Sequence, residues 1–292
     1  MFEEYIMKYG VPDILHAHCS QWAGAAAQEI SQRRNIPYFI TEHLSSGIFY
    51  DNYGRTWDHD KWAKTVISNA LEKAAGVITV ADESVEDIAG LFGRNINTVT
   101  ISNIVDVDFF SFKRREEKKG RKFRFCCLAN ANGSFFELKG YPTLLEAFDR
   151  CKNVELHIAG RETKGKRMRS SIAKLENKAN ITLHGELTKE EVRQLLYHCD
   201  ALVMASQSEM QPLSVMEAMS TGIPVVSTTA IPMSLRIPGA MFTVPKNDAQ
   251  ALTEGMIGIQ AIEPSEVISK AIRNIASPNI VAEQLERLFN KQ

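Results

Sequence analysis

The chain has 292 residues, of which 44% are hydrophobic and 24% are charged, and its formal net charge at pH 7 is -1. This composition is typical of a globular protein of one or two domains and excludes the disordered and fibrous classes. The near-neutral charge gives no general attraction to nucleic acid, so no nucleic-acid partner is expected. No apolar stretch reaches the roughly 18–20 residues of a membrane-spanning helix, and the first residues do not resemble a signal peptide.

Five cysteines are scattered along the sequence without a repeated C-x-x-C spacing. Two of them, Cys126 and Cys127, lie in an apolar run that is typical of a buried strand. We interpret the cysteines as reduced, mostly buried thiols of a cytoplasmic protein, and we expect neither a disulfide nor a zinc site. These observations do not exclude contact of the protein with a membrane surface.

The amino-terminal part alternates short apolar runs with helical patterns. Strands are predicted at 13–18, 37–43, 76–80 and 98–103, and helices at 20–33, 57–74 and 82–93. Such alternation predicts βαβ units and a largely parallel sheet.

A charged run at 112–124 interrupts the alternation, and we interpret it as a linker or an exposed edge. The pattern then restarts, with strands predicted at 123–130, 154–160, 181–187, 201–206 and 224–228 and helices at 141–151, 164–178, 191–199 and 212–222. The sequence thus predicts an α/β protein with two doubly wound, Rossmann-like domains. The first is 1–111 joined by a closing helix at 277–292, and the second is 112–276.

Ligands of open parallel sheets bind beyond the carboxyl ends of the strands. The residues predicted there are mostly polar or glycine: His16, His18, His43, Asn103, Asn130, Gly160, Gly185 and Glu209. This edge of each sheet is therefore where we expect a site.

A short apolar helix follows the strand at 201–206. Pro212 suits its first position because proline has a fixed φ and no N–H, and Gly222 followed by Pro224 ends it.

Two carboxylates frame this helix. Glu209 precedes it, and Glu217 lies about one and a half turns inside it, so both could face one cleft. The free backbone amides of residues 211–214 and the helix dipole form an anion site suited to phosphate, and the carboxylates can accept hydrogen bonds from paired sugar hydroxyls. On spacing alone, a Glu217 that points to solvent is an equal alternative.

Several motifs resemble those of the retaining, GT-B fold nucleotide-sugar glycosyltransferases of family 4. The two glutamates stand in an E-x7-E spacing that runs into "EAMSTGIPVVST", similar to the signature of that family. Further similar stretches are "KGYPTLLEAF", "NVELHIAGRE" and "ITLHGELTKEEVRQLLYHCDALVMAS", and upstream "PDILHAHCSQWAG" and "ISNIVDVDFF". The resemblance covers nearly the whole chain and implies a GT-B-like fold. Its carboxy-terminal domain would bind the nucleotide sugar, and its amino-terminal, acceptor-side domain would be incomplete.

The resemblance also implies roles on the donor side. Glu217 would hold the ribose hydroxyls of the nucleotide, and Glu209 would contact hydroxyls of the donor sugar. Backbone amides after Glu209 would bind sugar and phosphate, at Gln211, Leu213 and Ser214.

Other roles concern the leaving diphosphate and the reacting sugar. Lys139 would offset the charge of the diphosphate, and His18 would lie beside the transferring sugar; the structural alternative for His18 is a hydrogen-bonded histidine at a strand end. Asn130 stands in the donor site where the family has a Gly-Arg pair and cannot supply the arginine's charge. Arg161 is a candidate to compensate.

The implied activity is transfer of a sugar from a nucleotide-diphosphate-sugar donor to a glycan, lipid or small-molecule acceptor, in cell-surface polysaccharide or glycoconjugate synthesis, without a metal or other cofactor. The alternative is a truncated, non-catalytic nucleotide-binding relative, or one that needs a partner chain to complete its amino-terminal domain. The missing first strands, Asn130 and the "TAIP" that replaces a glycine-rich turn after "PVVST" favour the alternative. The Glu209/Glu217 pair, Lys139 and His18 favour the enzyme. "MQP" also replaces the family's x-F-G after Glu209.

Basic residues are concentrated at 113–124 and 161–169. They are interpreted first as solvated linker and helix faces. The sharper hypothesis is peripheral docking to an anionic membrane or to a lipid-phosphate acceptor, where basic clusters gain roughly 1 kcal/mol per residue.

Overall fold

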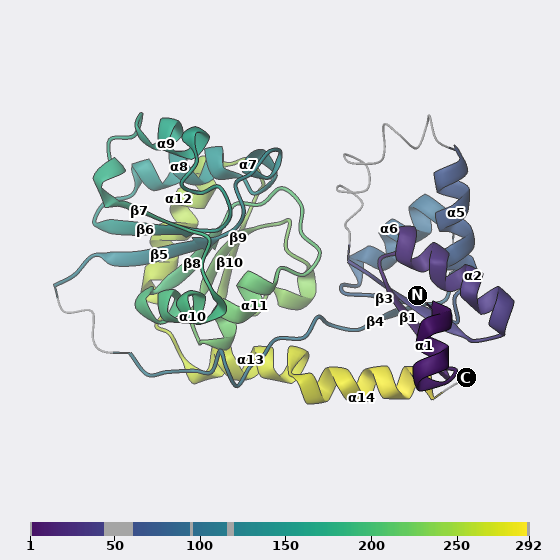
Figure 1. Ribbon diagram of the computed structural model, residues 1–292. Coiled ribbons are helices and arrows are strands. Elements are labelled where there is room, and N and C mark those ends of the chain that lie inside the picture. The colour runs from purple at the N-terminus through teal and green to yellow at the C-terminus, as the bar shows by residue number, and fades with distance from the viewer. Residues whose placement is uncertain (1, 44–60, 94–95, 116–119, 291–292) are drawn as a thin grey trace. The chain divides into compact units, whose positions relative to one another are not determined.

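The computed structural model describes residues 2–43, 61–93, 96–115 and 120–290 (Figure 1). The chain forms two compact units: unit 1 is Met1–Ser102 with Val281–Gln292, and unit 2 is Asn103–Ile280. The sequence placed these boundaries at 111 and 277. The difference arises because Val105, Val107 and Phe110 are buried in the core of unit 2, so the segment before residue 111 packs with the second sheet.

Unit 1 is built on a four-stranded parallel sheet in the order β1-β2-β3-β4. Its strands are β1 (Leu15–His18), β2 (Tyr38–Glu42), β3 (Gly76–Thr79) and β4 (Thr98–Thr100), and its helices are α1 (Phe2–Tyr9), α2 (Ala25–Arg34), α5 (Lys61–Glu72) and α6 (Glu83–Phe92). The final helix α14 (Pro278–Phe289) covers this sheet through Val281, which packs with Ile78 and Ile101. The predicted helix start at 57–60 lies outside the described residues.

Unit 2 is built on a six-stranded parallel sheet in the order β10-β9-β8-β5-β6-β7. Its strands are β5 (Phe123–Leu128), β6 (Val154–Ala159), β7 (Ile181–Gly185), β8 (Ala201–Met204), β9 (Val225–Thr228) and β10 (Met241–Val244). Strand order reverses between β5 and β8, which makes their carboxyl ends the topological switch point of the sheet.

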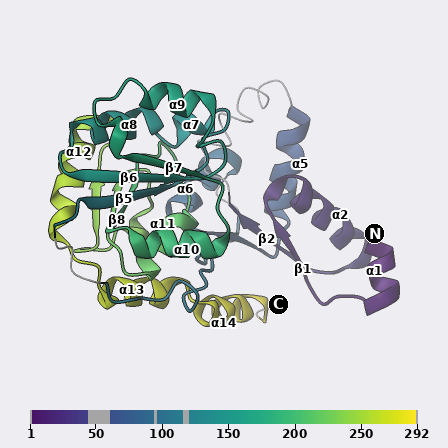
Figure 2. The ribbon, with the colours of Figure 1, turned by 60° about the vertical axis from the view of Figure 1, so that its left-hand side comes forward.

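Helices cover both faces of this sheet, as Figures 1 and 2 show. One face carries α7 (Phe135–Leu138), α8 (Tyr141–Arg150), α9 (Lys166–Ile172) and α12 (Ala249–Gly258); the other carries α10 (Lys189–His198), α11 (Leu213–Ser220) and α13 (Glu266–Ala276). Two large apolar clusters lie on the two sides of the strands. The predicted α/β class with two parallel sheets is confirmed.

One predicted helix is too long. The pattern at 164–178 gives only α9, which ends at Ile172. The residues after it are held by Asp149, whose carboxylate accepts the backbone N–H groups of Glu176 and Asn177, and the side chain of Asn177 donates back to the carbonyl of Asp149. These tertiary hydrogen bonds replace a further helical turn.

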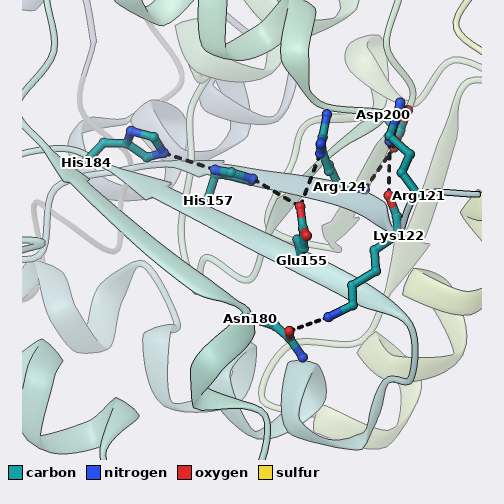
Figure 3. Close-up of polar contacts among 8 residues, drawn as sticks. All are labelled: Arg121, Lys122, Arg124, Glu155, His157, Asn180, His184 and Asp200. Atoms are coloured by element: carbon teal, nitrogen blue, oxygen red, sulfur yellow. Dashed lines mark hydrogen bonds and ion pairs between the residues drawn. The ribbon is translucent and has the colours of Figure 1, made fainter. Parts of the chain in front are cut away.

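The charged run after residue 111 is more than a solvated linker. Arg115 donates to the carbonyls of Leu196 and Tyr197 at 3.0 and 3.3 Å, where α10 ends. Arg121 forms a bidentate ion pair with Asp200 at 2.7 and 2.8 Å (Figure 3). Asp200 is only 1% exposed, so an ion pair with a buried carboxylate holds the described part of this run against unit 2.

No described helix has the length and apolar character needed to cross a membrane.

Candidate active site

A cavity of about 390 Å³ lies at the switch point of unit 2, where the loops after β5, β6, β7 and β8 meet the start of α11. Six residues that the sequence singled out for the donor site lie on its wall: Asn130, Lys139, Glu209, Leu213, Ser214 and Glu217. The rule that ligands bind at the carboxyl ends of parallel strands therefore located a real concavity.

Lys139 and Glu209 meet in this cavity. The Lys139 Nζ lies 2.6 Å from Glu209 Oε1, and the two side chains are 19% and 8% exposed. Gly140 makes this approach feasible, because its φ is +66° and a Cβ at that position would lie 1.9 Å from the carbonyl oxygen of Ala205. A glycine is thus required where the start of α8 passes the end of β8.

The amino terminus of α11 lies at the wall of the cavity. Pro212 is extended, with φ -69° and ψ 118°, and helix α11 begins at Leu213, so proline is the cap and not the first helical residue as predicted. The N–H groups of Val215 and Met216 bond to the carbonyl of Pro212. Those of Leu213 and Ser214 come before the helical ladder and remain as donors with the positive end of the helix dipole.

Glu217 lies on the cavity wall one turn further along α11. The face of this helix that carries Leu213, Ser214 and Glu217 is partly exposed, whereas Val215 and Met216 are fully buried in the core. Burial raises the pKa of the Glu217 carboxyl to about 7, although nearby Lys189 acts in the opposite direction. Within the described residues, the carboxylate has no hydrogen-bond donor, so the structure favours a cavity-facing group over the solvent-facing alternative.

The opposite wall is formed by the loops after β5 and β6. Asn130 Oδ1 accepts the backbone N–H of Arg161 at 2.9 Å. Gly160 permits this contact, because its φ is +140° and a Cβ there would lie 2.2 Å from the carbonyl oxygen of Ala129. Arg161 also lies 3.6 Å from Glu186, a second wall residue that sequence reasoning missed although it follows the strand-end glycine of β7.

Gln211 is not among the residues that line the cavity, and its role as a backbone amide donor stays a prediction. Its side-chain oxygen accepts the backbone N–H of Asn103 at 2.6 Å, and its carbonyl accepts from the Asn103 side chain at 3.2 Å. Gln211 is only 5% exposed and is occupied in anchoring the first segment of unit 2.

His18 belongs to unit 1, where its Nδ1 lies 2.9 Å from His43 Nε2. Within unit 1, His18 is therefore a hydrogen-bonded histidine at a strand end, as the structural alternative described it. Sequence reasoning missed Glu42, which is 1% exposed and accepts the backbone N–H groups of Ser20 and His43, each at 2.9 Å. Its only signal was a carboxylate at the end of an apolar strand. In the described part of the chain, no three His, Cys, Asp or Glu side chains form a group that could hold a metal ion.

Two units built on parallel α/β sheets, one of them with a cavity at its switch point, define a protein of the doubly wound, Rossmann-like fold class. The family model described as "Glycosyl transferases group 1" matches residues 110–274, and that described as "Glycosyltransferase Family 4" matches residues 4–109. The chain belongs to the group 1, family 4 glycosyltransferases.

One named relative is TuaC of Bacillus subtilis, which is named as a glycosyltransferase of teichuronic acid biosynthesis. The two sequences are 26% identical over 223 residues, which are 74% of this chain and 53% of TuaC. The sulfoquinovosyl transferase SQD2 of Arabidopsis thaliana is 24% identical over 280 residues, 90% of this chain and 52% of SQD2. The chain thus spans about half the length of these relatives.

Solved structures share the fold. Sucrose-phosphate synthase from Thermosynechococcus elongatus superposes with a TM-score of 0.85 at 18% identity, covering 99% of this chain and 76% of that one. Anabaena HepE in complex with UDP and glucose superposes with a TM-score of 0.82 at 16% identity, covering 99% of this chain and 81% of that one. These similarities confirm the GT-B fold.

Proposed function

We propose that the protein is a retaining glycosyltransferase that moves a sugar from a nucleotide-diphosphate-sugar donor to an acceptor hydroxyl. The observation that carries this proposal is the convergence of Lys139, Glu209, Glu217 and the first amides of α11 on one cavity. A lysine, free helix amides and two carboxylates supply donors for phosphate and acceptors for sugar hydroxyls.

Each wall residue then has a part in binding the donor. Glu217 accepts hydrogen bonds from the ribose hydroxyls, and Glu209 contacts hydroxyls of the donor sugar. The amides of Leu213 and Ser214 bind the sugar and the phosphate. Asn130 contributes a neutral side chain beside the diphosphate.

The chemistry follows from where charge develops. The bond between the anomeric carbon and the diphosphate oxygen breaks, and its electron pair leaves with the diphosphate. Lys139 and the α11 amides stabilise this negative charge as it forms, and because they supply positive charge directly we propose a reaction without a metal. Arg161 adds charge at the cavity wall in place of the arginine that Asn130 replaces. The acceptor oxygen forms the new bond to the anomeric carbon, and its proton leaves with the diphosphate. His18 is the residue that we propose for contact with the transferred sugar.

The names of the relatives suggest the acceptor class. TuaC and SQD2 are named for teichuronic acid biosynthesis and for sulfoquinovosyl transfer, and Escherichia coli WcaL for colanic acid biosynthesis. We therefore propose a glycan or lipid-linked acceptor in cell-surface polysaccharide or glycoconjugate synthesis. All five cysteines are free thiols, which supports a cytoplasmic location, with peripheral membrane contact through a lipid-linked acceptor.

A second function is favoured by one observation. Asn130, which lies on the cavity wall in the loop after β5, has no charge with which to stabilise a leaving diphosphate. In this second function, the protein binds a nucleotide without turnover, or needs a partner chain for activity. Detection of donor turnover by the purified chain distinguishes the two.

Titration calorimetry of the whole chain with UDP, GDP and ADP tests the donor site. We expect one nucleotide to bind and Glu217→Ala to abolish that binding. Glu254→Ala, on the exposed side of α12, is the matched control and should bind as the wild type does. If a folded Glu217→Ala protein keeps its nucleotide affinity, the donor-site assignment is wrong.

A further inference from the structure

Two histidines at adjacent strand ends in unit 1 share a hydrogen bond. Strands β1 and β2 are parallel, with His18 in register with Thr41, so His43 follows just beyond. His18 Nδ1 lies 2.9 Å from His43 Nε2, and the rings stack at 5.2 Å with an interplanar angle of 7°. His43 therefore sets the orientation of the His18 ring through Nδ1, and Nε2 of His18 takes no part in this hydrogen bond.

A buried carboxylate holds both histidine loops. Glu42 Oε2 accepts the backbone N–H of Ser20, two residues after His18, and Glu42 Oε1 accepts the backbone N–H of His43. The side chain is 1% exposed and ends a strand whose preceding residues Phe39 and Ile40 are 0% exposed. Burial of a carboxylate is unfavourable without charge-assisted hydrogen bonds, and here these bonds join the loop after β1 to the loop after β2.

The backbone between His18 and Ser20 is strained. Cys19 has φ +71°, a left-handed conformation that is uncommon for a residue other than glycine. A single π-helical turn, Ser20–Gly24, follows at once. Both features are frequent at functional sites and persist only where surrounding contacts enforce them. The hydrogen bond from Ser20 to Glu42 is one such contact, and that from the Cys19 N–H to the Thr41 carbonyl is another.

We propose that Glu42 is a positioning residue for sugar transfer, which fixes the loops after β1 and β2 so that His43 holds the His18 ring in one orientation. This inference rests on the proposed glycosyltransferase function. It adds that the carboxylate acts through two backbone amides and never touches the substrate.

Nitrogen-15 NMR of the histidine rings in the whole chain tests the geometry without turnover. In the wild type we expect a coupled His18–His43 pair with a defined tautomer. Glu42→Gln, which loses one acceptor and the charge, should abolish that coupling, and Glu42→Asp, which keeps the charge but is one methylene shorter, should weaken it. Glu29→Gln, an exposed change on α2 of the same unit, is the control and should leave the ring signals unchanged.

Turnover of UDP-, GDP- and ADP-glucose, each followed as release of its nucleotide, tests the consequence. We expect Glu42→Gln to lower kcat by about 100-fold with the donor KM unchanged, because misplacement of a reacting group by about 1 Å has an effect of this size. In a His43→Phe background the same change should have little further effect. Unchanged ring signals in folded Glu42→Gln or, if that variant does not fold, in Glu42→Asp would overturn the proposal. Absence of turnover in the wild type, with the coupling intact, would instead count against the glycosyltransferase function.

Discussion

Replacement of Glu217 by glutamine should stabilise the empty protein at alkaline pH. The carboxyl has a pKa of about 7 in the folded chain, against 4.5 ordinarily, because it is buried. Between these values the unfolded chain has lost this proton while the folded chain keeps it, so the free energy of unfolding falls as pH rises. The slope is about 1.4 kcal/mol per pH unit, or about 3 kcal/mol across the window. Glutamine has no proton to lose and removes this penalty.

The assay is urea unfolding of the wild type and Glu217→Gln at pH 5 and pH 8 without nucleotide. The three tryptophans, at positions 22, 57 and 62, all come before the unit boundary at residue 102 in the sequence, so tryptophan fluorescence follows unit 1. Far-ultraviolet circular dichroism follows the unfolding of both units. An unfolding transition that appears in circular dichroism but not in fluorescence therefore belongs to unit 2. We expect the stability difference between variant and wild type in unit 2 to grow by about 2.5 kcal/mol from pH 5 to pH 8.

Glu254→Gln is the control, because its side chain is exposed on α12 and should show no such growth. An equal difference between Glu217→Gln and the wild type at both pH values would refute the reasoning. If the stabilised variant also loses nucleotide binding, then Glu217 is kept at the expense of stability, as expected for a ligand-binding group.

Three further changes test other parts of unit 2. Burial, followed by the charges of His184 and His198, lowers the pKa of His157 to about 4. Figure 3 shows the contact of His157 with His184. The free energy of unfolding should fall by about 3 kcal/mol as pH drops from 6.5 to 4, because the unfolded chain binds the proton first, and His157→Gln should remove this loss in acid urea titrations. Gly140→Ala should destabilise unit 2 by at least about 2 kcal/mol in urea, through a left-handed φ and a collision, whereas Gly90→Ala, at an open position, should not. Lys139→Met should weaken UDP binding about ten- to hundredfold while leaving uridine binding unchanged in calorimetry; an equal loss for both would place Lys139 away from the diphosphate.

The strands and the strand-end loops could be predicted because they depend on local patterns. Buried runs such as that of β8 are short, β-branched or aliphatic and bounded by polar residues, and parallel order brings their ends to one edge. β10, α12 and α13 were missed. β10 is a short edge strand with exposed Phe242, which gives no continuous apolar run.

Side-chain partners were the part that sequence could not supply. Gln211 follows the right strand, yet its side chain turns to Asn103, which is 108 residues away in the chain. The sequence pattern around Glu42 is typical of an exposed residue at the end of a strand, but in the structure the backbone N–H of Ser20, from another loop, donates to its carboxylate. Each case depends on a backbone amide from a distant segment, and no local pattern encodes that meeting.

The contact between Lys139 and Glu209 has a consequence for what the empty cavity attracts. The ammonium group is already neutralised at 2.6 Å, so an arriving anion must displace Glu209 before it can use the charge. A small ion such as inorganic phosphate offers Glu209 nothing in exchange, whereas a nucleotide sugar brings hydroxyls that Glu209 can accept from as it releases the lysine. Under the proposed function, this ion pair would make the site select ligands that carry both a phosphate and a sugar over abundant simple anions.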